Sequence, residues 1–289
     1  MTHLQNKIAI VILNYMNYED TIACVNCALN QTYNNYEIII VDNGSSNQSY
    51  NILYFIFGNC PKITLLHSKK NLGFARGNNI GIKYARTKGK ADYVFVCNSD
   101  ILFDTDLFEQ ISKADCTGIG VISPTVYSLK GEAQPPTIRT DNIYQKAFVT
   151  SIFLFLYWIS SPITSFLYRS LRRRSMPCSS SEAGRGDKYV LQGCSYFLTP
   201  EFFRYYNQLY PKTFLYLEEI NLLIYLAKVR LASVVMDTSP VIHKEKGSAS
   251  LVYNRVQFDR KKLELCTVSM IKSLPMFFLN YKTIRKKYH

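Results

Sequence analysis

The chain has 289 residues, of which 47% are hydrophobic, and its formal net charge is +13. A chain of this length and composition can bury a large core, which excludes a disordered tail or a small domain held together by disulfides. The strong positive charge indicates an anionic partner, either nucleic acid or a membrane surface and phosphorylated substrates.

The eight cysteines show no paired spacing, so they predict a protein of the reducing cytosol rather than a secreted one. The one C-x-x-C motif, Cys24 to Cys27, lacks a second pair and a neighbouring histidine, which disfavours a metal or redox role. The first apolar run holds six residues before Asn14, which is too short for a signal peptide.

Four short apolar runs rich in β-branched residues predict buried strands in the first hundred residues. They are Ile8 to Leu13, Tyr36 to Val41, Ile63 to His67 and Tyr93 to Cys97. Helical segments alternate with these strands, among them one from Glu19 to Leu29 and one that ends at Arg86. The alternation predicts an α/β fold with a parallel, doubly wound sheet. No G-x-G-x-x-G follows the first strand, which disfavours a nicotinamide dinucleotide.

Polar side chains follow these strands at their carboxyl ends, where open α/β sheets bind ligands. Asp42 ends the second strand, in position to accept a hydrogen bond from a pyrimidine imide N–H or a ribose hydroxyl; an Asx turn or helix cap would explain it equally well. Asn98 and Asp100 follow the fourth strand. Their oxygens suit Mg²⁺ or Mn²⁺ on a diphosphate, although Asp100 alone could simply begin the next turn and helix.

The second half predicts a less regular succession of elements. We expect a helix from Leu107 to Lys113, a strand from Ile119 to Ser123, a loop from Gly131 to Thr140, a strand from Tyr189 to Leu198 interrupted at Gly193, a helix beginning at Thr199, a helix that starts with Glu218 and Glu219 and runs to Lys228, and a strand from Val234 to Met236. The paired acids could complement the helix dipole or provide a general base.

Two segments combine apolar and basic residues. Residues 147–159 are thirteen apolar-leaning positions, short of the roughly 20 that span a bilayer, and an arginine cluster follows up to Arg174. The tail from Phe258 repeats the combination. Both predict helices at a membrane interface, or alternatively helices packed on the core with a solvated basic face. With no zinc-finger or RNP-type motif present, membrane and diphosphate partners are favoured over nucleic acid.

Six segments occur in an order that is typical of one enzyme family. They are Val11 to Tyr15, Val41 to Ser45, Asn71 to Gly81 with its glycines and asparagines, Asn98-Ser99-Asp100, and Tyr216 to Leu222 followed by His243 to Ser248. Together they resemble the family 2 glycosyltransferases, inverting enzymes with the GT-A fold, and especially their rhamnosyltransferase-like branch. The resemblance covers about residues 8 to 250.

The resemblance implies a role for each matching residue. Donor-binding positions are Asn14, Tyr15, Asp42, Asn71, Gly73, Phe74, Asn78 and Asn98, with Tyr15 and Asp42 at the base. Asp100 would hold a divalent metal on the diphosphate, and His243 would complete its ligands. Glu219 would be the base, Glu218 would contact acceptor or donor sugar, and Gln192 and Gly193 would border the acceptor.

Three positions depart from the family pattern. Asn98 replaces the first acid of D-x-D, Glu219 stands where the family usually has Asp, and Asn221 replaces a frequent third acid. A carboxylate is kept at position 219 but it reaches one methylene further.

The resemblance also implies an organisation and a setting. We expect a GT-A domain over residues 1–250, a mostly parallel sheet with helices on both faces, with a helical insert at about 141–186 and a basic amphipathic helical tail over 251–289. The expected reaction transfers a sugar from a nucleotide donor, dTDP-rhamnose-like or a UDP-hexose, to a glycan or lipid-diphosphate-linked acceptor in bacterial surface polysaccharide synthesis. We expect a cytoplasmic enzyme, peripheral at the inner membrane face.

Two other classes of protein share part of this pattern. A nucleotidyltransferase would have the same sheet and metal, but it should carry a glycine-rich, arginine-containing loop after the first strand, and Asn14 to Asn17 has neither. A catalytically silent subunit that binds nucleotide sugars stays open, because the acidic pair departs from the family pattern.

Overall fold

The structure is a computed structural model that describes residues 5–151, 188–245 and 255–289. The expectations for the apolar segment beyond residue 151, the arginine cluster and the end of the His243 motif lie outside the described residues. Residues 143–151 are helical and leave Phe148 and Val149 exposed. No helix of the described part is both long and apolar enough to cross a bilayer.

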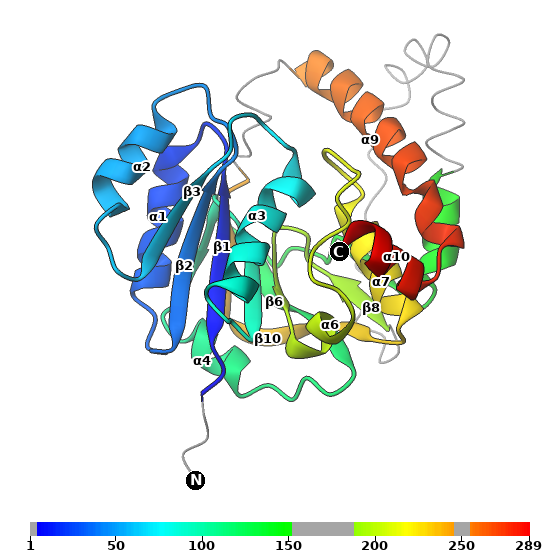
Figure 1. Cartoon of the computed structure of the whole chain (residues 1–289), viewed down its shortest axis with the longest axis horizontal. Helices are drawn as coiled ribbons and strands as arrows, with labels where there is room; N and C mark the ends of the chain where they lie inside the picture. The colour runs from blue at the N-terminus through cyan, green and yellow to red at the C-terminus, as the bar shows by residue number, and fades with distance from the viewer. Residues whose placement is uncertain (1–4, 152–187, 246–254) are drawn as a thin grey trace.

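The centre of the fold is a ten-stranded mixed sheet with the strand order β3-β2-β1-β4-β9-β6-β10-β8-β7, and β5 pairs with β10 (Figure 1). The strands are β1 (Ile8–Asn14), β2 (Tyr36–Asp42), β3 (Ile63–His67), β4 (Tyr93–Asn98), β5 (Ile101–Phe103), β6 (Ile119–Ser128), β7 (Ile138–Thr140), β8 (Tyr189–Leu191), β9 (Ser195–Leu198) and β10 (Ala232–His243). The labelled helices are α1 (Tyr18–Leu29), α2 (Ser49–Phe57), α3 (Phe74–Thr87), α4 (Leu107–Ser112), α6 (Pro200–Tyr205), α7 (Glu218–Lys228), α9 (Arg255–Phe278) and α10 (Tyr281–Tyr288).

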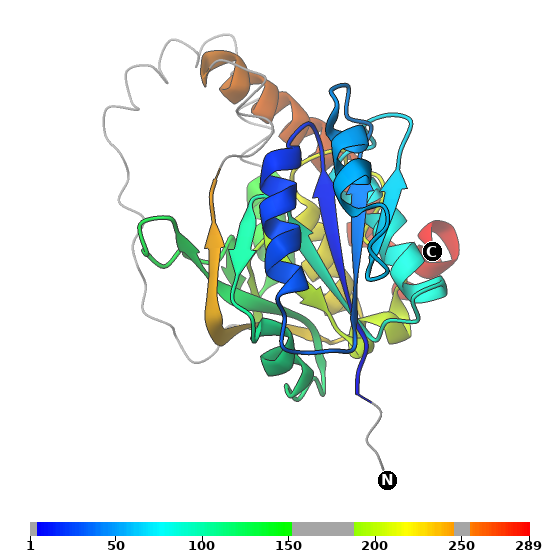
Figure 2. The same cartoon turned by 90° about the vertical axis from the view of Figure 1, so that its left-hand side faces the viewer.

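The first four strands confirm the predicted α/β pattern. Each lies within one residue of its predicted bounds, and β3, β2, β1 and β4 are all parallel to one another. Their carboxyl ends point to the upper edge of the molecule in Figures 1 and 2, the side on which α9 lies. Beyond β4 the sheet becomes mixed, because β9 is antiparallel to both β4 and β6.

Several strand bounds differ from the expectation. The predicted loop from Gly131 to Thr140 ends in β7, and β5 was not predicted at all. The strands β6 and β10 run well past their predicted ends, to Ser128 and His243. Both contain a proline, which in a sequence pattern indicates a strand end. A register shift between Met236 and Val241 accommodates the irregularity in β10.

Helices cover both faces of the sheet because successive strand residues point to opposite sides. Ile8, Ile10 and Ile12 pack on one face with the apolar sides of α1, α2 and α4. Ala9 and Val11 pack on the other face with α3, α6 and α7. The same cluster includes Met276 of α9 and Ile284 of α10, so the C-terminal helices share the core of the sheet domain.

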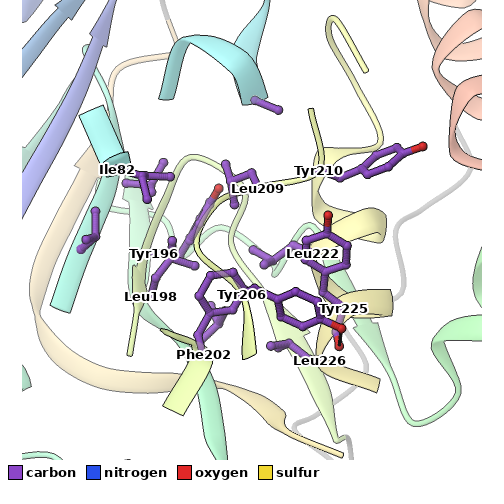
Figure 3. Close-up of a cluster of buried hydrophobic side chains, with 14 of the residues drawn as sticks. Ile82, Tyr196, Leu198, Phe202, Tyr206, Leu209, Tyr210, Leu222, Tyr225 and Leu226 are labelled. Atoms are coloured by element: carbon purple, nitrogen blue, oxygen red, sulfur yellow. Dashed lines mark hydrogen bonds between the residues drawn. The ribbon is translucent and has the colours of Figure 1, made fainter. Parts of the chain in front are cut away.

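Buried side chains of β9, α6 and α7 pack together in one cluster (Figure 3). Tyr206 and Tyr225 stack with ring centroids 4.2 Å apart, and Phe202 lies 5.7 Å from Tyr206. The ring of His289, directly after α10, lies 5.4 Å from Tyr206 and 5.5 Å from Tyr225, so this stack joins α6 and α7 to the end of α10.

Candidate active site

A pocket of about 470 Å³ opens at the carboxyl edge of the sheet. Six separate stretches of chain line it: the start of α3, the end of β4, the segment before β7, the turn before β9, the segment that starts α7, and the end of β10. Seven of the residues predicted for the site meet there: Phe74, Asn98, Gln192, Gly193, Glu218, Glu219 and His243.

Glu218 and Glu219 occupy the first turn of α7, on the pocket wall. The two residues before them, Tyr216 and Leu217, have positive φ angles of 71° and 66°. Residues other than glycine rarely adopt a positive φ angle, and each such residue costs about 1 to 3 kcal/mol. The backbone therefore turns sharply here and presents the acidic pair to the pocket.

The environment of this pair favours the protonated form. Burial and the neighbouring charge of Glu219 raise the pKa of Glu218 to about 8, and one Glu218 oxygen has no hydrogen-bond partner in the described part of the chain. Burial raises the pKa of Glu219 as well. Carboxylates with raised pKa values are suited to accept a proton near neutral pH.

Gly193 fixes the place of the Glu219 carboxyl group. A Cβ at position 193 would lie 2.2 Å from the Glu219 Oε1 atom and 2.9 Å from its Cγ. There is no room for a side chain between the Gly193 backbone and the Glu219 carboxyl group. Because glycine has no side chain, Glu219 can reach the pocket.

The C-terminal helix α9 supports this wall. Asn221, one turn into α7, donates a buried hydrogen bond of 2.9 Å to the Ser273 hydroxyl, and the Ser269 hydroxyl donates to the Leu215 carbonyl at 2.8 Å. The Lys262 ammonium lies 5.5 Å from the Tyr216 ring centroid. Asn221, which departs from the family pattern, thus links α7 to α9.

Pairing of β5 with β10 brings His243 to Asp100. The antiparallel register places His243 opposite Ile101, and His243 Nε2 lies 3.4 Å from Asp100 Oδ2. Burial lowers the pKa of His243, but its contacts with Asp100 and Cys194 outweigh this and raise it to about 10.

Asp100 and His243 provide part of the ligand set that a divalent cation needs. Asp100 is 4% exposed, and among the described residues its Oδ2 atom has no partner apart from the contact with His243. An acidic oxygen left open in this way is what a cation requires, and Mg²⁺ and Mn²⁺ take further ligands from water and substrate phosphates. The described residues contain no group of three or more His, Cys, Asp or Glu that could hold a metal by themselves.

A second group of predicted residues lies apart from the pocket lining. Asn14 and Asp42 are register partners at the ends of β1 and β2, and Asn14 Nδ2 donates to Asp42 Oδ2 at 2.7 Å. The backbone N–H of Ser45 and His67 Nδ1 meet the other oxygen, both at 3.1 Å. Asp42 is fully buried, whereas Tyr15 beside this group is partly exposed.

The loop between β3 and α3 is built on its asparagines and Gly73. Asn71 Oδ1 accepts bonds from Asn43 Nδ2 and from the Gly73 N–H. Gly73 has a φ of 83°, and a Cβ there would lie 2.1 Å from the Phe214 carbonyl oxygen. Asn78, fully buried in α3, donates to the Phe74 carbonyl at 3.1 Å. The loop is therefore held against the segment that leads to α7.

Gln192 is largely occupied by structural bonds. Its N–H donates to the Ser123 hydroxyl at 3.1 Å and its side-chain amide donates to the Gln134 carbonyl at 2.9 Å. The Gly193 N–H donates to Thr137 Oγ1 at 3.1 Å. The turn thus joins the pocket to the segment before β7.

The sequence analysis did not single out seven of the pocket residues, which are Gln134, Pro135, Thr137, Cys194, Leu215, Tyr216 and Glu245. Three of them, Gln134, Pro135 and Thr137, belong to the segment from Gly131 to Thr140 that the sequence predicts only as a loop. The pair of prolines in it was the one signal, because a rigid loop next to a sheet edge is a common binding wall.

Residues 9–179 match the family described as Glycosyl transferase family 2. The chain belongs to this family. Glycosyltransferase GlyG of Streptococcus pneumoniae serotype 4 is 31% identical over 116 residues, 39% of this chain and 37% of that protein. The uncharacterized glycosyltransferase YibD of Escherichia coli is 30% identical over 121 residues, 40% of this chain and 35% of that protein. The similarity thus spans little more than a third of these relatives.

Solved structures show that the fold of this family 2 chain is GT-A. The mannosyltransferase PcManGT of Pyrobaculum calidifontis, solved with GDP-Man and Mn²⁺, superposes with a TM-score of 0.55 at 10% identity, over 94% of this chain and 70% of that one. Residues 1–349 of TarS from S. aureus superpose with a TM-score of 0.52 at 10% identity, over 93% and 72%. These likenesses concern the fold alone.

Proposed function

We propose that this family 2 chain is an inverting glycosyltransferase that moves a sugar from a nucleoside diphosphate to an acceptor hydroxyl. The observation that carries the proposal is the pocket itself, which brings the acidic pair of α7 and the Asp100–His243 pair to one edge of the sheet. In this arrangement the Asp100–His243 pair can act on the leaving group, and the acidic pair can act on the incoming nucleophile.

In this proposal Glu219 takes the proton from the acceptor hydroxyl as the oxygen attacks the anomeric carbon, which contributes roughly 10² to 10⁴ in rate. Glu218, next to it, contacts the acceptor or donor sugar. Gln192 and Gly193 border the acceptor, with Gly193 keeping the space that Glu219 occupies. Attack from the face opposite the diphosphate inverts the anomeric configuration.

The donor would lie along the carboxyl ends of β1, β2 and β4. Asn14, Tyr15 and Asp42 belong to the base end, and the loop from Asn71 to Asn78 follows the nucleotide and sugar. Asp100, His243 and the Asn98 amide would hold a Mg²⁺ or Mn²⁺ ion, and such an ion supplies positive charge to the departing diphosphate. The Mn²⁺ complex of PcManGT supports this part of the proposal.

For the donor we propose a dTDP-rhamnose-like sugar or a UDP-hexose, and for the acceptor a glycan or lipid-diphosphate-linked glycan of a bacterial surface polysaccharide. Two of the similar proteins are a chondroitin synthase and a hyaluronan synthase of Pasteurella multocida, each 31% identical over 90 residues and 9% of its own length. The rhamnosyltransferase-like motifs support the first donor.

We also propose that the protein works at an anionic membrane surface. One face of α9 is apolar and exposed, with Val268, Ile271, Leu274 and Phe278 at helical spacing, while Met270, Ser273 and Met276 on the opposite face are buried. Basic residues occur on both C-terminal helices: Lys272 is exposed on α9, and Arg285, Lys286 and Lys287 form the last turn of α10. An exposed apolar helix face accompanied by basic residues on the same two helices matches a surface of acidic lipids.

The two parts of the chain would have separate roles. We propose that residues 1–250 form the catalytic domain, with the insert at about 141–186, and that the tail over 251–289 both supports α7 and carries the membrane face. The hydrogen bonds that join Asn221 and Leu215 to α9 support the first of these roles.

The test is a thermal-shift panel of nucleoside diphosphates and nucleotide sugars, with and without Mn²⁺, followed by transfer assays on Glu219→Gln. A ligand at 100 times its Kd adds about 2.7 kcal/mol of stability. We expect a metal-dependent shift with one donor, and in Glu219→Gln the same shift with transfer abolished. Donor binding without any transfer by the wild-type chain would instead support a silent subunit.

A further inference from the structure

We propose that His67, through its Nε2 atom, is the residue that reads a uracil or thymine base of the donor, and that Asp42 acts behind it as a positioning residue. The proposal rests on the proposed function, since it names a contact to the nucleotide of that reaction. It follows from three side chains that lie in a row across the carboxyl ends of β1, β2 and β3. In register, Asn14 pairs with Asp42 and Asp42 pairs with His67.

Asp42 itself has no free surface. Its side chain is 0% exposed, and its oxygens receive three N–H groups, from Asn14, the Ser45 backbone and His67. A base could reach the Asp42 carboxylate only if this network opened. The exposed member of the network is His67, whose side chain is 40% exposed.

The network also determines which nitrogen of His67 carries the proton. Asp42 accepts from Asn14 and from Ser45, so it acts as acceptor toward His67 as well, and Nδ1 donates to it at 3.1 Å. In a neutral imidazole, Nε2 is then the acceptor. The described residues offer no hydrogen-bond partner to this Nε2 atom.

The ring is held in place from one face. Tyr50 of α2 lies against His67 with ring centroids 4.4 Å apart, and Tyr54 stacks on Tyr50 in turn at 6.2 Å. A fixed ring with a single outward acceptor suits a base that offers a single N–H. Uracil and thymine present one imide N–H between two carbonyl groups, whereas the same edge of guanine presents two adjacent donors.

The experiment measures affinities by calorimetry, at neutral pH with fixed Mn²⁺, for UDP, dTDP, GDP, ADP and UDP methylated at N3. The N3 methyl group removes the imide N–H. His67→Phe keeps an aromatic ring against Tyr50 but removes both nitrogens. Phe55→Ala is the matched control, because it removes a ring of α2 that is 89% exposed and leaves Tyr50, His67 and Asp42 in place.

We expect the wild-type protein to bind UDP or dTDP more tightly than GDP and ADP. His67→Phe should weaken UDP or dTDP about tenfold and leave N3-methyl-UDP unchanged, since the two changes remove the same hydrogen bond. Phe55→Ala should leave all affinities as they are.

Other results overturn the inference. An equal loss for UDP and N3-methyl-UDP in His67→Phe would mean that His67 only supports the loop. Unchanged UDP binding in that variant, or a wild-type preference for GDP or ADP, would remove His67 as the reader of a pyrimidine. If the wild-type protein binds no nucleoside diphosphate at all, the proposed function fails, and the inference fails with it.

Discussion

Replacing Gly193 by alanine should damage catalysis while leaving the fold intact. The new Cβ would lie 2.2 Å from Glu219 Oε1, far inside ordinary contact distance. The clash involves the end of a flexible glutamate side chain rather than backbone, so the carboxyl group moves by about 1 Å or more and the sheet does not. A shift of this size at the reacting groups costs roughly 10²-fold in turnover.

The assay compares kcat, the KM for the donor, and the melting temperature of Gly193→Ala with those of the wild type. We expect kcat to fall roughly 10²-fold, equivalent to about 2.7 kcal/mol of barrier. The donor KM should stay near its wild-type value because the role proposed for Glu219 is toward the acceptor, and stability should change by less than about 1 kcal/mol.

Gly120→Ala is the matched control. Its Cβ would lie 2.4 Å from Leu226 Cδ2 and 3.1 Å from Leu231 Cδ1, so the same added methyl group strikes the core instead of the acidic pair. That variant should melt at a lower temperature and keep the specific activity of its folded fraction. Wild-type turnover in Gly193→Ala would refute the placement of Glu219 as the base.

Three further predictions follow from the structure. Gly73→Ala should lower the free energy of unfolding in urea by about 1 to 3 kcal/mol, because its φ is 83° and its Cβ would meet the Phe214 carbonyl at 2.1 Å; an unchanged midpoint would contradict this geometry. Since the pKa of Glu218 is raised from its ordinary 4.5 to about 8, the unfolded chain releases this proton first, and stability should fall as pH rises between these two values; Glu218→Gln should flatten that fall in urea titrations at several pH values. Phe278→Glu should reduce co-sedimentation with anionic vesicles several-fold, whereas Phe55→Glu, also at a highly exposed ring but on α2, should not; equal effects would argue against the α9 face.

The order of the motifs along the chain is enough to identify the family. The motifs around Asp42, Gly73 and Asp100 can be recognised directly in the sequence. Each of them needs a particular residue type at a particular position after a strand. The first four strands were equally predictable, since their β-branched runs are bounded by polar residues, and β1 and β2 are buried on both faces.

The second half of the sheet was harder to predict. The strands β6 and β10 continue through prolines, and local pattern alone cannot tell that a bulge between paired strands will absorb the irregularity. The short strands β5 and β7 owe their existence to partners far away in the chain, so no local signal could have shown them.

The sequence by itself determined the family, the α/β layout of the first hundred residues and most of the residues that could do chemistry. Only the tertiary structure decided which of them meet. The pairing of β5 with β10 joins His243 to Asp100, the missing side chain of Gly193 makes room for Glu219, and burial encloses Asp42 behind His67. The physical reason is that contact between segments far apart in the chain depends on strand register and helix packing, which no single stretch of sequence encodes.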